Sequence, residues 1–102
     1  MASRLELHEE LCNILGSRNV YFQPPASVMM TYPCIRYSRS GMDQDYADNK
    51  TYKYTNRYEL IIIDSDPDSE IPFKILGHFQ MCRLDRSYAA DNLNHTVLTL
   101  YY

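Results

Sequence analysis

A dense set of oxygen-bearing side chains lies between the middle and the last third of the chain. The run is Asp64-Ser65-Asp66-Pro67-Asp68-Ser69-Glu70. It resembles the first positions of a calcium-binding loop, but it lacks the glycine at the sharp turn and the bidentate glutamate at the right distance. Asp and Ser side chains also accept hydrogen bonds from the free N–H groups of a helix start and favour its dipole. The run therefore predicts the start of a helix.

Residues that could act in catalysis are scattered. His8, His78 and His95 fall on two predicted helices and a strand, and no spacing places two of them on one face. No nucleophile signature accompanies Cys34. The chain has no GxSxG turn, and its three glycines form no phosphate-binding loop. We therefore expect no catalytic residue, no metal and no cofactor.

Tyrosines alternate with basic residues in the stretch 51–64, TYKYTNRYELIIID. With a period of two, Tyr52, Tyr54 and Tyr58 share one face, while Lys53 and Arg57 lie on the other. Such a pattern suits a platform on which single-stranded nucleic acid stacks. The formal net charge of -3 argues against nucleic acid as the main partner. A Tyr-rich strand end of mixed charge fits a subunit interface better.

The same stretch predicts the central strand of a sheet. It is rich in β-branched and aromatic residues and contains neither Gly nor Pro. Its polar face is charged near Lys53 and becomes apolar at Ile61 and Ile63. This gradient predicts a strand that is buried on both faces at one end and projects beyond its own core at the other.

Four elements or connections are expected before this strand. An amphipathic helix of about four turns begins with a capping box at Ser3 and Glu6 and stops at Gly16. Its apolar face is Leu7, Leu11, Ile14 and Leu15. A short strand at 19–23 and a second strand at 34–39 follow. Residues 41–50, GMDQDYADNK, are polar and acidic, which predicts an exposed hairpin loop.

A helix and two strands are expected after it. Pro72 is tolerated in the first turn of a helix, and Ile71, Ile75 and Phe79 recur four apart. A helix cap at Asp66 or Ser69 is compatible with this spacing. Next come a short strand around 86–88, a turn at 91–92 and a final strand at 95–102, whose two tyrosines we expect to be held by packing.

This order of elements predicts the α+β class. We expect one domain, residues 1–102, with a mixed, mainly antiparallel sheet and two helices packed on one face. The pI of about 5.5, the charged N-terminus and the lack of a long apolar run favour a cytosolic protein without a membrane segment. Three separated cysteines favour reduced thiols. Ten tyrosines without a tryptophan suit surfaces that become buried on association.

Several phrases of the sequence resemble small proteins from the head–tail module of tailed bacteriophages and prophages. They are VYFQPP at 20–25, YPCIRYS at 32–38 with YADN at 46–49, DPDSEIP at 66–72 and ADNLNHTVLTLYY at 90–102. The closest similarity is to tail terminators. That resemblance implies a hexameric ring in the virion, assembled in the host cytoplasm, which caps the tail tube and docks to the head connector. It also implies the absence of catalytic and metal-binding residues.

A ring subunit needs two different complementary patches, because its contacts are heterologous. The candidate interface residues are Tyr52, Tyr54, Arg57, Met29, Met30, Asp43 and Asp45. The acidic loop could pair across the seam with Lys50, Lys53 and Arg57. Carboxylates that face the lumen would let DNA pass without specific binding, because they repel phosphates.

Two alternatives remain open at the level of sequence. Head-closure and other neck proteins of the same phage module have similar sizes. A small adaptor that binds its partner by strand addition through the C-terminal strand belongs to a different class.

Overall fold

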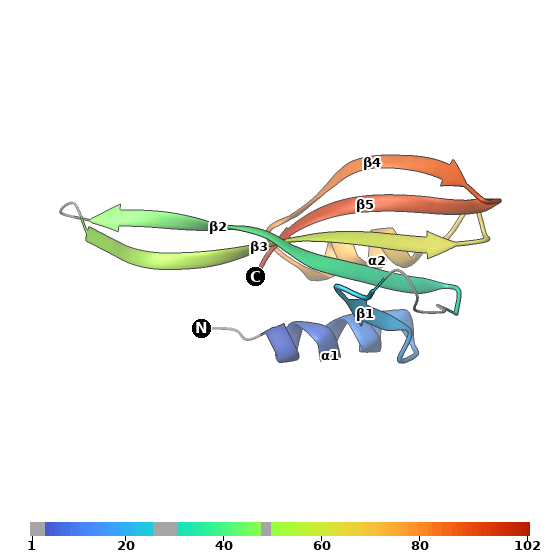
Figure 1. Cartoon of the computed structure of the whole chain (residues 1–102), viewed down its shortest axis with the longest axis horizontal. Coiled ribbons are helices and arrows are strands. Elements are labelled where there is room, and N and C mark those ends of the chain that lie inside the picture. Colours follow the sequence, from blue (N-terminus) through green and yellow to red (C-terminus); the bar gives the residue numbers. More distant parts are fainter. Residues whose placement is uncertain (1–3, 26–30, 48–49) are drawn as a thin grey trace.

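The computed structural model describes residues 4–25, 31–47 and 50–102, with the backbone alone described for 42–47 and 50–54. The elements are α1 (Arg4–Leu15), β1 (Val20–Phe22), β2 (Cys34–Ala47), β3 (Lys50–Asp64), α2 (Ile71–His78), β4 (Cys82–Ala90) and β5 (Leu93–Tyr101). The strands form one sheet in the order β1-β2-β3-β5-β4, and only β1 and β2 run parallel. Both helices lie on one side of the sheet (Figure 1). The predicted α+β class, with a mixed, mainly antiparallel sheet, is confirmed.

β3 is the central strand, as its sequence predicts. Leu60 lies opposite Tyr37 of β2 and Leu98 of β5 in the ladder. At the Asp64 end, Ile62 and Ile63 are both buried, so this part of the strand is covered on both faces. The predicted gradient from a projecting end to a buried end is therefore confirmed.

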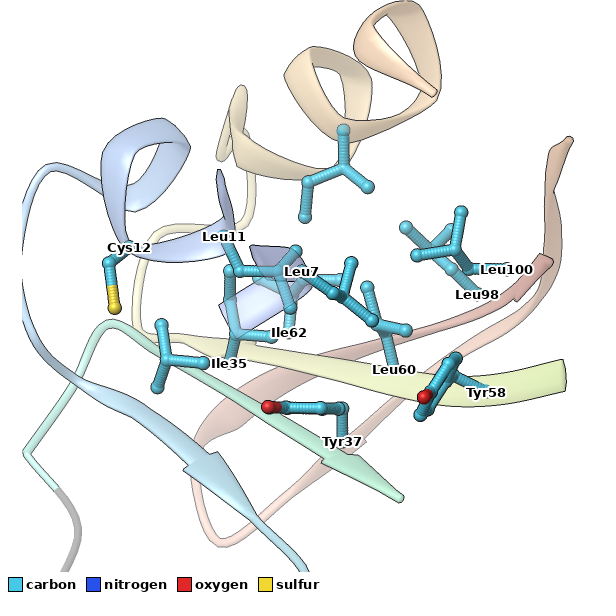
Figure 2. Packing of buried hydrophobic residues seen from close by; sticks show 12 residues of the cluster. Leu7, Leu11, Cys12, Ile35, Tyr37, Tyr58, Leu60, Ile62, Leu98 and Leu100 are labelled. Carbon is cyan, nitrogen blue, oxygen red and sulfur yellow. The ribbon is translucent and has the colours of Figure 1, made fainter. Parts of the chain in front are cut away.

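The core lies between the sheet and the two helices (Figure 2). α1 contributes Leu7 and Leu11, and α2 contributes Ile75, all with no exposed surface. The strands supply the opposite wall of the core, which includes Ile35, Tyr37, Tyr58, Leu60, Ile62, Leu98 and Leu100. Burial of this apolar surface is the main stabilising contribution to the fold.

The helix boundaries follow local sequence signals. α1 ends where Gly16 adopts φ 82° and its N–H donates to the Cys12 carbonyl at 2.9 Å. The predicted cap residue Ser3 lies outside the described residues. The N-cap of α2 is Glu70, and not Asp66 or Ser69, and its side chain makes no capping hydrogen bond.

The acidic run before α2 forms turns. Asp64 Oδ1 accepts a hydrogen bond from the Asp66 amide at 3.0 Å, and Asp66 Oδ1 accepts one from the Asp68 amide at 2.9 Å. These contacts are the local turns that Asp favours because its carboxylate can accept from a backbone N–H two residues ahead.

The predicted hairpin loop at 41–50 is wrong. β2 continues to Ala47 and β3 begins at Lys50, with these two residues opposite each other. The acidic composition suggested a loop, but strand preference depends strongly on pairing context. Here the Tyr- and Thr-rich start of β3 provides the partner strand for Asp43 and Asp45.

β4 is also longer than predicted. It runs from Cys82 to Ala90 at the edge of the sheet and is largely exposed. The predicted turn after it is confirmed, because Asp91 and Asn92 have φ values of 53° and 61° and close a two-residue hairpin.

Candidate interaction surface

The β2–β3 ribbon extends beyond the rest of the sheet (Figure 1). β5 reaches β3 only as far as Arg57, which lies opposite Tyr101. β1 pairs with β2 only at residues 35–37. In the part of the chain that the structure describes, residues 41–47 and 50–56 therefore form a ladder only with each other. We call these residues the arm.

The arm has the structural features of a surface made for association. A two-stranded ribbon is only marginally stable in water by itself, and three or more strands are needed for independent stability. Its outer edges present backbone N–H and C=O groups to which another chain can bind. The arm also gives the molecule an elongated shape, with extents of 51 × 25 × 23 Å.

The arm leaves the core at a bulge. The β2–β3 register shifts between Arg39 and Gly41, so Ser40 has no residue opposite it. Ser40 Oγ donates to the Arg57 carbonyl at 3.2 Å, and the Arg57 guanidinium donates to Ser40 Oγ and to the Ser40 carbonyl, both at 3.3 Å. The guanidinium crosses Gly41, where a Cβ would come within 2.5 Å of Nη2. Arg57 is thus half-buried at the root of the arm.

The last two residues hold the root of the arm from the other side. The Tyr102 amide donates to the Asn56 carbonyl at 3.0 Å, and the Tyr101 amide donates to the Met81 carbonyl at 2.9 Å. The Tyr102 ring packs against Phe79 with centroids 5.9 Å apart. Burial and, next, the nearby Glu10 carboxylate raise the pKa of Tyr102 to about 12. The prediction that packing holds these tyrosines is confirmed.

The other predicted interface residues fall into two groups. Tyr52, Tyr54, Asp43 and Asp45 belong to the arm, where the structure describes their backbone, and Met29 and Met30 lie outside the described residues. Asp45 lies opposite Lys53 in the register, and a second shift leaves Tyr52 with no residue opposite it. Acidic and basic residues that we expected to pair across a seam are therefore neighbours within one arm.

Groups that could perform catalysis do not converge in the described residues. The three histidines lie against separate partners: His8 Nδ1 is 2.8 Å from the Tyr37 hydroxyl, His78 Nε2 is 3.3 Å from Glu10 Oε1, and the His95 ring stacks on Tyr88 at 4.8 Å. Within the described ranges, no three His, Cys, Asp or Glu side chains are grouped so that they could hold a metal ion.

The cysteines are free thiols. Cys12 and Cys34 are buried and Cys82 is partly buried. Burial raises the pKa of the Cys34 thiol to about 11 and also raises the pKa values of Cys12 and Cys82. Because the thiolate is the nucleophile, these positions are poorly suited to covalent chemistry at neutral pH.

A polar contact beneath α1 stabilises the fold. The Tyr37 hydroxyl is buried with its ring, accepts a hydrogen bond from Arg4 at 3.4 Å and lies 2.8 Å from His8 Nδ1. Burial, and then the charges of Arg18 and Arg4, lower the pKa of His8. The Nδ1 atom of a neutral imidazole can accept a hydrogen bond from the Tyr37 hydroxyl, which satisfies both groups.

A groove lies between α2 and β4, and we call it the α2–β4 groove. Its volume is about 160 Å³. Its lining includes the apolar residues Phe73, Leu76 and Leu84 and the polar residues Asp64, Asp66 and Asn94. Phe73 and Leu84 are 72% and 52% exposed. The sequence carried a signal for this feature, because Phe73 lies about 200° around the helix from the buried Ile75.

No protein-family model matches this chain, and no curated protein matches it in sequence. A functional proposal therefore rests on the architecture, on the arm and on the phrases of sequence described above.

A helix that crosses a bilayer needs about 20 mainly apolar residues. In the described residues, no helix is both long and apolar enough to cross a bilayer.

Proposed function

We propose that this protein is a structural subunit of a phage head–tail junction, acting as a tail terminator. Six copies form a ring that caps the finished tail tube and presents a docking surface to the head-closure or connector protein. The tail tube protein and the connector are its partners, and DNA passes through the ring without specific binding. The protein works in the virion without a cofactor and is not an enzyme.

The arm is the observation that carries this proposal. It is a two-stranded ribbon outside the core, with open edges and three tyrosines, Tyr46, Tyr52 and Tyr54, in its sequence. Tyrosine is enriched at protein interfaces because its ring buries a large apolar area while its hydroxyl can still form a hydrogen bond. β3 runs without interruption from the core into the arm. One strand therefore connects the core of the subunit to its proposed contact surface.

The resemblance to head–tail proteins supports the particular kind of assembly. The similar phrases at 32–38 and 46–49 fall in β2 or beside it, and the phrase at 90–102 includes all of β5. They therefore coincide with the strands that build the sheet and the arm. A sheet with helices on one side is also the architecture that the resemblance to terminators implies.

The strand-addition alternative needs a correction. We expected a partner to add to the C-terminal strand, but β5 lies between β3 and β4 and both of its edges are paired. Strand addition through β5 is therefore wrong, and the edges available in the described residues are those of β1, β4 and the arm. A head-closure role within the same phage module remains the second candidate.

Native mass tests the proposal directly. Light scattering or mass photometry is performed on the purified chain alone, with tail tubes, and with head connectors from the phage that encodes it. The variant for comparison replaces residues 43–55 with Asn-Gly, which joins Met42 to its opposite residue Asn56 through a two-residue turn. We refer to it as the arm-deleted variant.

A ring in solution, or a ring-sized cap on tube ends, supports the terminator role if the arm-deleted variant forms neither. Binding to connectors without binding to tubes would support head closure instead. A monomer that binds neither tubes nor connectors would refute a structural role at the junction.

A further inference from the structure

The molecule has its two contact-prone surfaces at opposite ends. The arm lies at the Lys50 end of β3, and the α2–β4 groove lies at the Asp64 end of the same strand (Figure 1). Because the two surfaces lie at opposite ends of a molecule 51 Å long, one copy cannot place its own arm in its own groove. Any contact between the two surfaces must therefore join different copies.

The groove has the chemistry to receive tyrosine and lysine side chains. Its apolar wall, formed by Phe73 and Leu84, can cover an aromatic ring. The carboxylates of Asp64 and Asp66, which also line the groove, can accept a hydrogen bond from a phenol or pair with an ammonium group. Its volume of about 160 Å³ is below the roughly 300–1,000 Å³ typical of small-molecule sites. It therefore suits a small number of protein side chains.

The arm carries the complementary groups. The start of β3 reads Lys50-Thr51-Tyr52-Lys53-Tyr54, with two cations and two tyrosines within five residues. Lys50 lies opposite the uncharged Ala47 in the β2–β3 register. The acidic run that borders the groove contains Asp64, Asp66, Asp68 and Glu70. The start of β3 is thus opposite in charge to this acidic run, while Asp43 and Asp45 on β2 balance the two lysines within the arm.

We propose that the α2–β4 groove of one copy receives the arm of the next copy. This inference rests on the proposed ring function and identifies the second of the two patches that a ring requires. Contact between different surfaces at opposite ends is heterologous, and it gives a ring when the rotation from one copy to the next closes. Phe73 and Leu84 become buried in this seam, which accounts for apolar side chains that the isolated chain leaves in water.

Cross-linking on the wild-type assembly, in solution or on tube ends, tests the contact. A carbodiimide joins amines to carboxylates that touch, and mass spectrometry identifies the peptides. We expect links from Lys50 or Lys53 to Asp64 or Asp66. Because these groups lie at opposite ends of one chain, such links report contacts between copies.

Substitution provides an independent test. Phe73→Arg places a charged side chain in the groove and should abolish assembly without unfolding, because Phe73 is largely exposed. Leu5→Arg is the matched control, since Leu5 is an exposed apolar residue on α1 (66% exposed) and lies outside both surfaces. The control should assemble as the wild type does, and circular dichroism checks that both variants are folded.

Mixing distinguishes head-to-tail contact from contact between two arms. The Phe73→Arg chain has an intact arm, and the arm-deleted variant has an intact groove. Each should be monomeric alone, and an equimolar mixture should give a species of about twice the 12.0 kDa chain mass. If arms instead bind arms, the Phe73→Arg chain associates with itself and leaves the arm-deleted variant monomeric, and the inference is refuted.

The remaining outcomes separate the inference from the proposed function. If the Phe73→Arg chain still forms rings, or if the expected cross-links are absent from wild-type rings, the groove is not the acceptor while the ring function stands. If the wild-type chain assembles neither alone nor on tubes, the proposed function itself fails.

Discussion

Deletion of the arm should remove assembly while it leaves the stability of the fold nearly unchanged. In the described residues, 43–47 and 50–55 form a ladder only with each other, so no third strand of the sheet pairs with them. A two-stranded ribbon is marginally stable by itself, because the entropy lost on ordering its backbone offsets most of the gain from its ladder. We therefore expect the arm-deleted variant to change the free energy of unfolding by about 1 kcal/mol or less.

A substitution in the same strand provides the contrast. Leu60 has no exposed surface and lies between Tyr37 and Leu98 in the sheet. Leu60→Ala removes buried methyl groups and leaves a cavity, which costs about 2–5 kcal/mol. Leu60→Ala and deletion of the arm thus differ in their effect on the free energy of unfolding, because Leu60 lies inside the core and the arm lies outside it.

Urea denaturation measures both effects. The experiments are done at a protein concentration at which the wild type is monomeric, because assembly would stabilise the native state by mass action. The slope of free energy against urea shows whether two-state unfolding is preserved. A loss of about 2 kcal/mol or more in the arm-deleted variant, comparable to that for Leu60→Ala, would refute the view that the arm lies outside the cooperative core.

Three further predictions concern the fold. Tyr37→Phe should lower the free energy of unfolding in urea by about 1 kcal/mol, because it removes the hydroxyl that hydrogen-bonds with Arg4 and His8 but keeps the ring. An unchanged free energy would show that this contact does not stabilise the protein. The pKa of His8 is lower in the folded protein than in the unfolded chain. The contribution of His8 to the free energy of unfolding is therefore fully present above the unfolded pKa of about 6.5 and is lost as pH falls through the lower folded pKa. The wild type should therefore lose more stability than His8→Gln between neutral and mildly acidic pH, and equal losses would contradict this assignment. Cys34, with its pKa raised to about 11, should react with a thiol reagent more slowly than Cys82 in the folded protein, and this difference should disappear in urea; equal rates in the folded state would show that Cys34 is not protected.

The local features of the fold could be predicted from the sequence because their causes are local. The apolar spacing of Leu7 and Leu11 determines which face of α1 is buried, and Gly16 supplies the positive φ that ends the helix. Asp91 and Asn92 tolerate the left-handed conformation that a two-residue hairpin requires. The composition of β3 was sufficient to predict both its central place and its projecting end.

The arm and the α2–β4 groove depend on contacts between elements that are distant in the sequence. Asp43 and Asp45 have low strand preference, and they lie in a strand because a Tyr- and Thr-rich segment lies opposite them. The guanidinium of Arg57, a residue that the sequence predicts at an interface, lies over Gly41 beside the bulge at Ser40. Neither effect is visible from the spacing of residues along one strand.

The class of the fold, its central strand and a tyrosine-rich strand end follow from the pattern of residues along the chain. The α2–β4 groove does not follow from that pattern. Phe73 belongs to α2 and Leu84 to β4, and only the packing of these two elements side by side creates the groove. Periodicity along a chain shows which face of an element is apolar. Whether that face is covered depends on the elements that pack next to it, and this is a property of the folded molecule.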